Sequence, residues 1–149
     1  MLQINVVLYA AVAATAFYCL NAMAECKGSQ NLPSEQTHVE FRINDKTISN
    51  SDREKLREWV AIVNEKYAIQ NWITIVGSAA DSEQTPKVLA MNRAVTVARE
   101  ALQDGLVNAP LQLKAQVYPT KHSEAASSET REVTVEISPG CPNNCCDGQ

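Results

Sequence analysis

Residues 77–94, GSAADSEQTPKVLAMNRA, contain the side chains of this sequence that could best hold a ligand. The first half has a hydroxyl at Ser78 and a carboxylate at Asp81, and the second half carries Arg93 on a predicted helix. A carboxylate and a guanidinium form hydrogen bonds stronger than those of neutral groups. Two alternatives stay open. Arg93 could cover the core with its stem while its head stays in water, and Asp81 could cap a turn.

No pattern of residues predicts catalysis or a bound metal. An enzyme needs a nucleophile with a placed base or a metal constellation. Ser127, Ser128 and His122 share a loop, but nearness in sequence is not a catalytic triad. His38 and His122 are isolated from each other and from any metal-ligand spacing. We therefore expect a noncatalytic protein without a cofactor.

The N-terminal segment predicts export. Residues 1–24 carry no charged side chain, contain an apolar run over residues 6–20, and end in the pattern AMA that signal peptidase cleaves. We expect residues 1–24 to be a signal peptide and the protein to be periplasmic. The alternative is an uncleaved membrane anchor, although the apolar run is short for a span of about 20 residues.

Cleavage would leave four of the five cysteines, which are Cys26, Cys141, Cys145 and Cys146. An even number of cysteines in an exported chain favours disulfides, and their positions at the two ends suggest staples between the termini. Four cysteines allow three pairings, and the sequence does not choose among them. A zinc site fits less well, because Cys-x-x-x-Cys-Cys without a nearby His does not match structural zinc spacings.

Length and charge limit the remaining possibilities. The 149 residues suit one domain, and a formal net charge of −4 argues against nucleic acid as the main partner. We expect a polar leader over residues 25–38, a folded domain over residues 39–138 and a Cys-rich tail over residues 139–149.

The first half of the folded domain predicts a strand, a helix and a strand. Residues 39–43 alternate apolar and polar side chains, as a half-buried strand requires. Residues 51–54, SDRE, have the form of a capping box that opens a helix. Residues 72–76 are rich in β-branched side chains, and Gly77 is expected to end this second strand. The helix has one apolar face, which consists of Leu56, Trp59, Val60, Val63 and Tyr67.

The second half predicts a helix and two strands. Pro86 suits the first turn of a helix, where its missing N–H has no consequence, and Gly105 suits the C-terminal stop. Residues 111–117 and 133–137 alternate apolar and polar side chains and predict strands. The helix is apolar over a broad arc, which we expect to press against a sheet. One stripe of this arc is Val88, Met91, Val95, Ala98 and Leu102, and the other is Ala90, Ala94, Val97 and Ala101.

The predicted order of elements is therefore β-α-β-α-β-β. Two helices must cover one face of a sheet whose other face shows polar side chains. This order predicts an α/β (α+β) two-layer sandwich with a mixed sheet and both helices on one face.

This order, together with four short motifs, resembles the C-terminal domain of outer-membrane protein A (OmpA) and its relatives in peptidoglycan-associated lipoprotein and flagellar motor stators. The resemblance covers residues 39–137. Its motifs are Val39-x-Phe41, Ile-x-Ile-x-Gly at residues 73–77, Leu89-x-x-x-Arg93-Ala94 and Arg131-x-Val133.

The resemblance implies a binding site for the diaminopimelate residue of the peptidoglycan stem peptide. In the family, an Asp just after the strand-two Gly and an Arg in helix two pair with the ammonium and carboxylate of this residue. Arg93 stands at the position of the family Arg. Where the family has Gly-x-Thr-Asp, this chain has GSAA, and its first carboxylate is Asp81, one place late. The implied ligand-binding residues are Arg93, Asp81 and Ser78.

Two functions are compatible with this resemblance. The first is a periplasmic, noncatalytic envelope protein that associates with peptidoglycan through diaminopimelate. The alternative is a degenerate OmpA-like fold that acts as a structural or protein-interaction module in an envelope-spanning secretion or conjugation assembly. The expected partners are the stem peptide or an envelope protein complex, and membrane contact is expected only if residues 1–24 are not cleaved.

Overall fold

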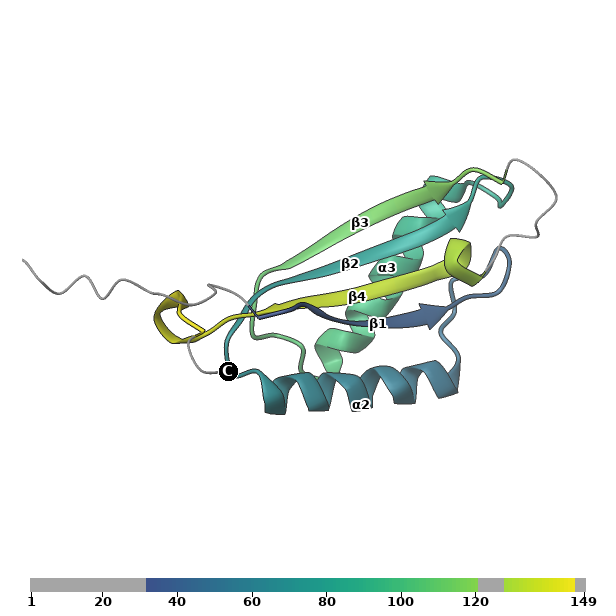
Figure 1. Cartoon of the computed structure of the whole chain (residues 1–149). Helices are drawn as coiled ribbons and strands as arrows, with labels where there is room; N and C mark the ends of the chain where they lie inside the picture. The colour runs from purple at the N-terminus through teal and green to yellow at the C-terminus, as the bar shows by residue number, and fades with distance from the viewer. Residues whose placement is uncertain (1–31, 121–127, 147–149) are drawn as a thin grey trace, which may run out of the picture.

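The computed structural model describes residues 32–120 and 128–146, which form one sheet and one layer of helices (Figure 1). The predicted signal peptide lies outside the described residues, and no described helix is long and apolar enough to cross a bilayer. The elements are β1 (Glu35–Glu40), α2 (Asn50–Lys66), β2 (Gln70–Ala80), α3 (Pro86–Gln103), β3 (Leu111–Tyr118), η1 (Ser128–Arg131), β4 (Glu132–Pro139) and η2 (Pro142–Asn144).

The sheet is mixed, with the strand order β1-β4-β2-β3. β2 runs parallel to β3, whereas β4 is antiparallel to both β1 and β2. α2 contacts β1, and α3 contacts β2 and β3, so that the two helices form the second layer (Figure 1). The prediction of a two-layer sandwich with a mixed sheet and two helices is confirmed.

The core lies between the two layers and follows the predicted patterns. Ile73, Ile75 and Val135 are fully buried in the central strands, where Ile75 stands opposite Val135. α2 buries Leu56, Val60 and Val63, which confirms its predicted apolar face. Burying apolar surface contributes roughly 25 cal/mol per Å², so this shared face is the main reason why the layers stay together.

The first helix begins earlier than expected, because Ser49 rather than Ser51 is its N-cap. Ser49 has the extended backbone that an N-cap needs, and its hydroxyl accepts the backbone N–H of Asp52 at 3.1 Å. The capping box predicted at residues 51–54 is therefore wrong, because it places the N-cap two residues too late. These residues form the first turn itself.

β1 and β2 also differ from the predicted strands, and β1 ends at Glu40 rather than at residue 43. β1 begins at Glu35, inside the predicted polar leader, because β4 supplies partners along its whole length, including polar pairs such as Gln36 with Glu136. β2 does not end at Gly77. It continues to Ala80, because β3 pairs with each of its last residues, from Gly77 opposite Ala115 onward.

α3 begins at Pro86 as predicted, and Gly105 adopts the positive φ of 97° that suits the residue after a helix. The expectation that its whole apolar arc presses against the sheet is wrong. α3 lies over β2 and β3 and buries only one side, which includes Ala94, Val97 and Ala101. The other stripe, except for Ala98, is exposed. Its exposed members are Val88, Met91, Val95 and Leu102.

Candidate functional site

A close contact between a strand and a helix positions the candidate arginine. Gly77 lies in β2 directly beneath α3, where a Cβ atom would come within 2.0 Å of the carbonyl oxygen of Ala90. Ala90 and Ala94 are themselves fully buried and add little bulk between the two backbones. This close packing carries Arg93, one residue before Ala94, into the interior.

Arg93 is fully buried, with 0% of its side chain exposed, so the alternative in which its head stays in water is wrong. Its Nε donates to one acceptor, and Nη1 and Nη2 donate to two each. A guanidinium has five N–H donors, so every donor of Arg93 has a partner inside the chain. The acceptors are the backbone carbonyls of Arg42, Asp45 and Ser78 and both carboxylate oxygens of Glu83.

Glu83 is the acidic partner of Arg93. Its two oxygens accept from Arg93 at 2.7 and 3.0 Å, in a bidentate pair. The same oxygens accept the backbone N–H groups of Asn44 at 2.8 Å and Ala80 at 2.9 Å. Burial alone would raise the pKa of Glu83, but these hydrogen bonds, led by that from Arg93, outweigh burial and lower the pKa below its ordinary value.

Sequence reasoning missed Glu83 because the segment DSEQ at residues 81–84 contains two acids, and no local pattern shows which one faces inward. The answer depends on the loop before α2. Asn44 in that loop adopts a φ of 57°, and its side chain accepts the backbone N–H of Gln84 at 2.8 Å. Asn44 also donates its own backbone N–H to the carboxylate of Glu83, so it links the loop before α2 to the loop before α3.

The structure places Asp81 and Ser78 in different surroundings. Asp81 is exposed at the end of β2, and its carboxylate accepts the backbone N–H of Thr120 at 2.9 Å and also the Thr120 hydroxyl. Asp81 thus ties the end of β2 to the segment after β3, in keeping with a structural role in a turn. Ser78 is buried and contacts Arg93 through its backbone carbonyl. Of the three predicted ligand-binding residues, the structure joins Ser78 and Arg93.

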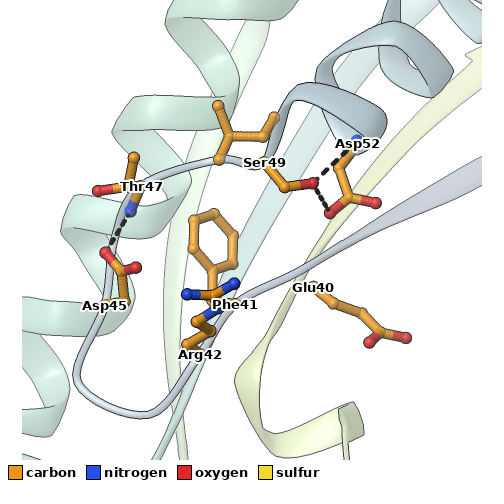
Figure 2. A pocket seen from close by; sticks show the side chains of 8 residues that line it. Glu40, Phe41, Arg42, Asp45, Thr47, Ser49 and Asp52 are labelled. Carbon is orange, nitrogen blue, oxygen red and sulfur yellow. Dashed lines mark hydrogen bonds between the residues drawn. The ribbon is translucent and has the colours of Figure 1, made fainter.

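Two open hollows border the loop that covers Arg93. The larger, of about 390 Å³, lies between β1 and the start of α2 (Figure 2). Asp45, whose pKa is lowered by the backbone N–H of Thr47, and Asp52, bonded to Ser49, lie on its wall. The smaller, of about 310 Å³, lies between this loop and the start of α3. No group of His, Cys, Asp and Glu in the described parts of the chain could hold a metal ion.

The cysteine-rich tail contains a local disulfide. Cys141 and Cys146 are bonded, with their Cα atoms 5.1 Å apart, and this bond closes a short loop around η2. Cys145 is also disulfide-bonded. Cys26 lies outside the described residues, so a staple between the termini stays a prediction.

The side chain of His38 in β1 forms a hydrogen bond with that of Thr134 in β4. His122 lies outside the described residues.

We expect the Arg93–Glu83 pair to make the fold sensitive to acid. The pKa of Glu83 is lower in the folded protein than its ordinary value of about 4.3, so the charged form stabilises the fold above that pH. This contribution is lost as the pH falls through the folded-state pKa. Urea unfolding at pH 7, 5, 4 and 3 should therefore show a large difference between wild type and Glu83→Gln at pH 7, which shrinks below about pH 4.

The matched control is Glu58→Gln, on the exposed side of α2, which should change the unfolding free energy little at any of these pH values. A difference between wild type and Glu83→Gln that does not vary with pH would contradict the assigned role of the pair.

The fold matches that of solved OmpA-like domains. The OmpA-like domain of FopA1 from Francisella tularensis subsp. tularensis SCHU S4 has a TM-score of 0.58 and 16% sequence identity, over 72% of this chain and 73% of that chain. The peptidoglycan-associated lipoprotein from Burkholderia pseudomallei has a TM-score of 0.56 and 16% identity, over 67% and 88%. The periplasmic domain of Helicobacter pylori MotB has a TM-score of 0.56 and 12% identity, over 81% and 91%. No family model and no curated protein sequence matches the chain.

Proposed function

We propose that this chain, whose fold is that of OmpA-like domains, is a noncatalytic module of the bacterial envelope that acts through protein contacts. One observation carries the proposal. All five N–H donors of Arg93 are bonded inside the chain, so no donor is left for the carboxylate of a stem peptide. Glu83 supplies the carboxylate that a ligand would otherwise bring.

The energetic cost of opening this pair favours the same conclusion. Removing one partner from a buried ion pair costs about 3–5 kcal/mol, because the other charge is left without compensation. A ligand carboxylate that displaced Glu83 would at best restore the charge pair, while the backbone N–H groups of Asn44 and Ala80 would lose their acceptor. In addition, Arg93 would have to keep its bonds to the Arg42 and Asp45 carbonyls to hold the covering loop.

Peptidoglycan association is the second candidate function. The fold favours it, since one similar structure is that of a peptidoglycan-associated lipoprotein. It requires that Glu83 leave Arg93 and that Asp81, now bonded to Thr120, turn toward the ligand. Both candidates place the chain in the periplasm, with membrane contact only if residues 1–24 remain attached.

A titration separates the two candidates. We expect the backbone amide signals of residues 77–94 to stay unchanged in NMR spectra when a diaminopimelate-containing stem peptide is added to millimolar concentration. We also expect no cosedimentation with purified peptidoglycan. The Burkholderia pseudomallei lipoprotein named above serves as the positive control.

Asp81→Asn is the informative variant, because Asp81 is exposed and its replacement should leave the fold intact. Saturable shifts centred on residues 77–94 that disappear in Asp81→Asn would establish peptidoglycan binding and overturn the proposal.

A further inference from the structure

α3 carries a second apolar face, which points away from the sheet. Its residues alternate spacings of three and four, which is the pattern of the a and d positions in a coiled-coil seam. Four of the five are exposed, with 59% for Val88, 37% for Met91 and Val95, and 45% for Leu102. We call this set the α3 seam: Val88, Met91, Val95 and Leu102, together with Ala98 between the last two, which is 5% exposed and packs in the core.

A hollow beside the seam adds a place for a partner side chain. It has a volume of about 320 Å³ and is lined mainly by apolar atoms. Met91 and Val88 of the seam form one wall, and Ala115 of β3 forms the other. Because β3 is at the edge of the sheet, no further described strand covers this side. A seam with an adjoining hollow is suited to a helix whose apolar side chains insert between those of α3.

The charges that flank the seam are positive. Lys87 and Arg99 are exposed on α3, and neither forms an ion pair within the described residues. The acid of α3, Glu100, and the acid just after it, Asp104, face α2, where they pair with arginines. The chain as a whole has a formal net charge of −4, so this basic face departs from the average surface. Complementarity therefore calls for acidic groups on the partner.

A second copy that docked through its own α3 meets this requirement poorly. Its α3 would bring no exposed acid to Lys87 or Arg99, because Glu100 is already paired with Arg53. If two α3 helices packed side by side in parallel, Lys87 and Arg99 of one copy would also face the same residues of the other copy. Opposed like charges are destabilising.

We propose that the α3 seam docks an amphipathic helix of another protein, with apolar seam residues and glutamate or aspartate on both flanks. The proposal rests on the proposed function as a protein-interaction module and names its contact surface. Val95, at the centre of the seam, and Arg99, on its flank, are the residues whose replacement should affect docking most.

The test uses a synthetic helical peptide of about three heptads, with leucine at the seam positions and glutamate on both flanks. Fluorescence anisotropy with the purified full chain should show saturable binding. Val95→Asn should weaken binding at least about tenfold, since it places an amide in the apolar contact. Arg99→Glu should weaken binding of this peptide and strengthen binding of a second peptide with lysine on the flanks. Val107→Asn is the matched control, because Val107 is a 64% exposed valine outside α3.

Three results would overturn the inference: no saturable binding, equal binding of the glutamate and lysine peptides, or a dimer in sedimentation velocity that Val95→Asn abolishes. The last would show that a second copy is the occupant. The two proposals fail separately. If neither the helical peptide nor the stem peptide binds, only the docking surface is rejected. If the stem peptide binds through Asp81, the proposed function is rejected, whether or not the helical peptide binds.

Discussion

Arg93→Ala is expected to destabilise the whole domain rather than to remove a binding residue from an intact fold. The change deletes five hydrogen bonds and leaves Glu83 buried without its countercharge. The expected cost is about 3–5 kcal/mol, which is a large part of the 5–15 kcal/mol that typically stabilises a domain. Urea unfolding followed by circular dichroism measures this loss.

Three further variants show whether the bonds or the charge carry the effect. Arg93→Lys keeps the charge but has three donors on one nitrogen, so it cannot reproduce the bidentate contact and should also destabilise. Arg93→Met combined with Glu83→Gln removes both charges and should remain destabilised, because the Arg42 and Asp45 carbonyls still lose their donors. Arg99→Ala, at an exposed arginine on the same helix, should stay within about 0.5 kcal/mol of wild type.

An unfolding midpoint that stays unchanged in Arg93→Ala would contradict the buried pair. Arg93 would then be available to a ligand in solution, and peptidoglycan binding would become the better proposal.

Gly77→Ala is expected to push α3 away from β2. A Cβ atom at this position would lie 2.0 Å from the carbonyl oxygen of Ala90 and 2.9 Å from the backbone nitrogen of Ala94. Both are backbone atoms of α3, so no side-chain rotation relieves the overlap. Overpacking of this kind typically costs about 1–3 kcal/mol, occasionally more, and we expect the upper end.

The consequence should reach the buried pair, because Arg93 stands one residue before Ala94 and bonds to Ser78 in β2. Hydrogen exchange should therefore accelerate at the amides of α3 and at Asn44 and Ala80, whose N–H groups bond to Glu83. Gly140→Ala is the matched control. The three atoms nearest to a Cβ there all belong to the side chain of Asn71, the first at 2.6 Å, whereas those at Gly77 are backbone atoms. Equal destabilisation by the two substitutions would contradict the proposed contact between β2 and α3.

Elements with a strong local pattern follow directly from the sequence. β3 and β4 were predicted from alternating side chains, because each strand has a face toward the helices and a face away from them. Pro86 and Gly105 predicted the ends of α3 from their backbone preferences alone. β1 begins earlier than its pattern indicates, because polar residues such as Gln36 are held by pairing with β4 rather than by burial.

The candidate site could be predicted only in part. The motif around Arg93 predicted its position on the second helix, because a motif records spacing along the chain. It could not identify the groups that surround the guanidinium. Those groups come from β2, from the loop before α3 and from the loop before α2, and they meet only when all three segments are in place.

Local sequence patterns therefore determine the order of elements, the ends of α3 and the fold class, because backbone preference and side-chain periodicity act over a few residues. Tertiary structure decides which side of α3 is buried and which acid pairs with Arg93. Leu89 and Val88 are adjacent apolar residues, yet only Leu89 faces the sheet. Asp81 and Glu83 are both acids of one loop, yet only Glu83 pairs with Arg93. These choices depend on distances between segments far apart in the sequence, which no local pattern contains.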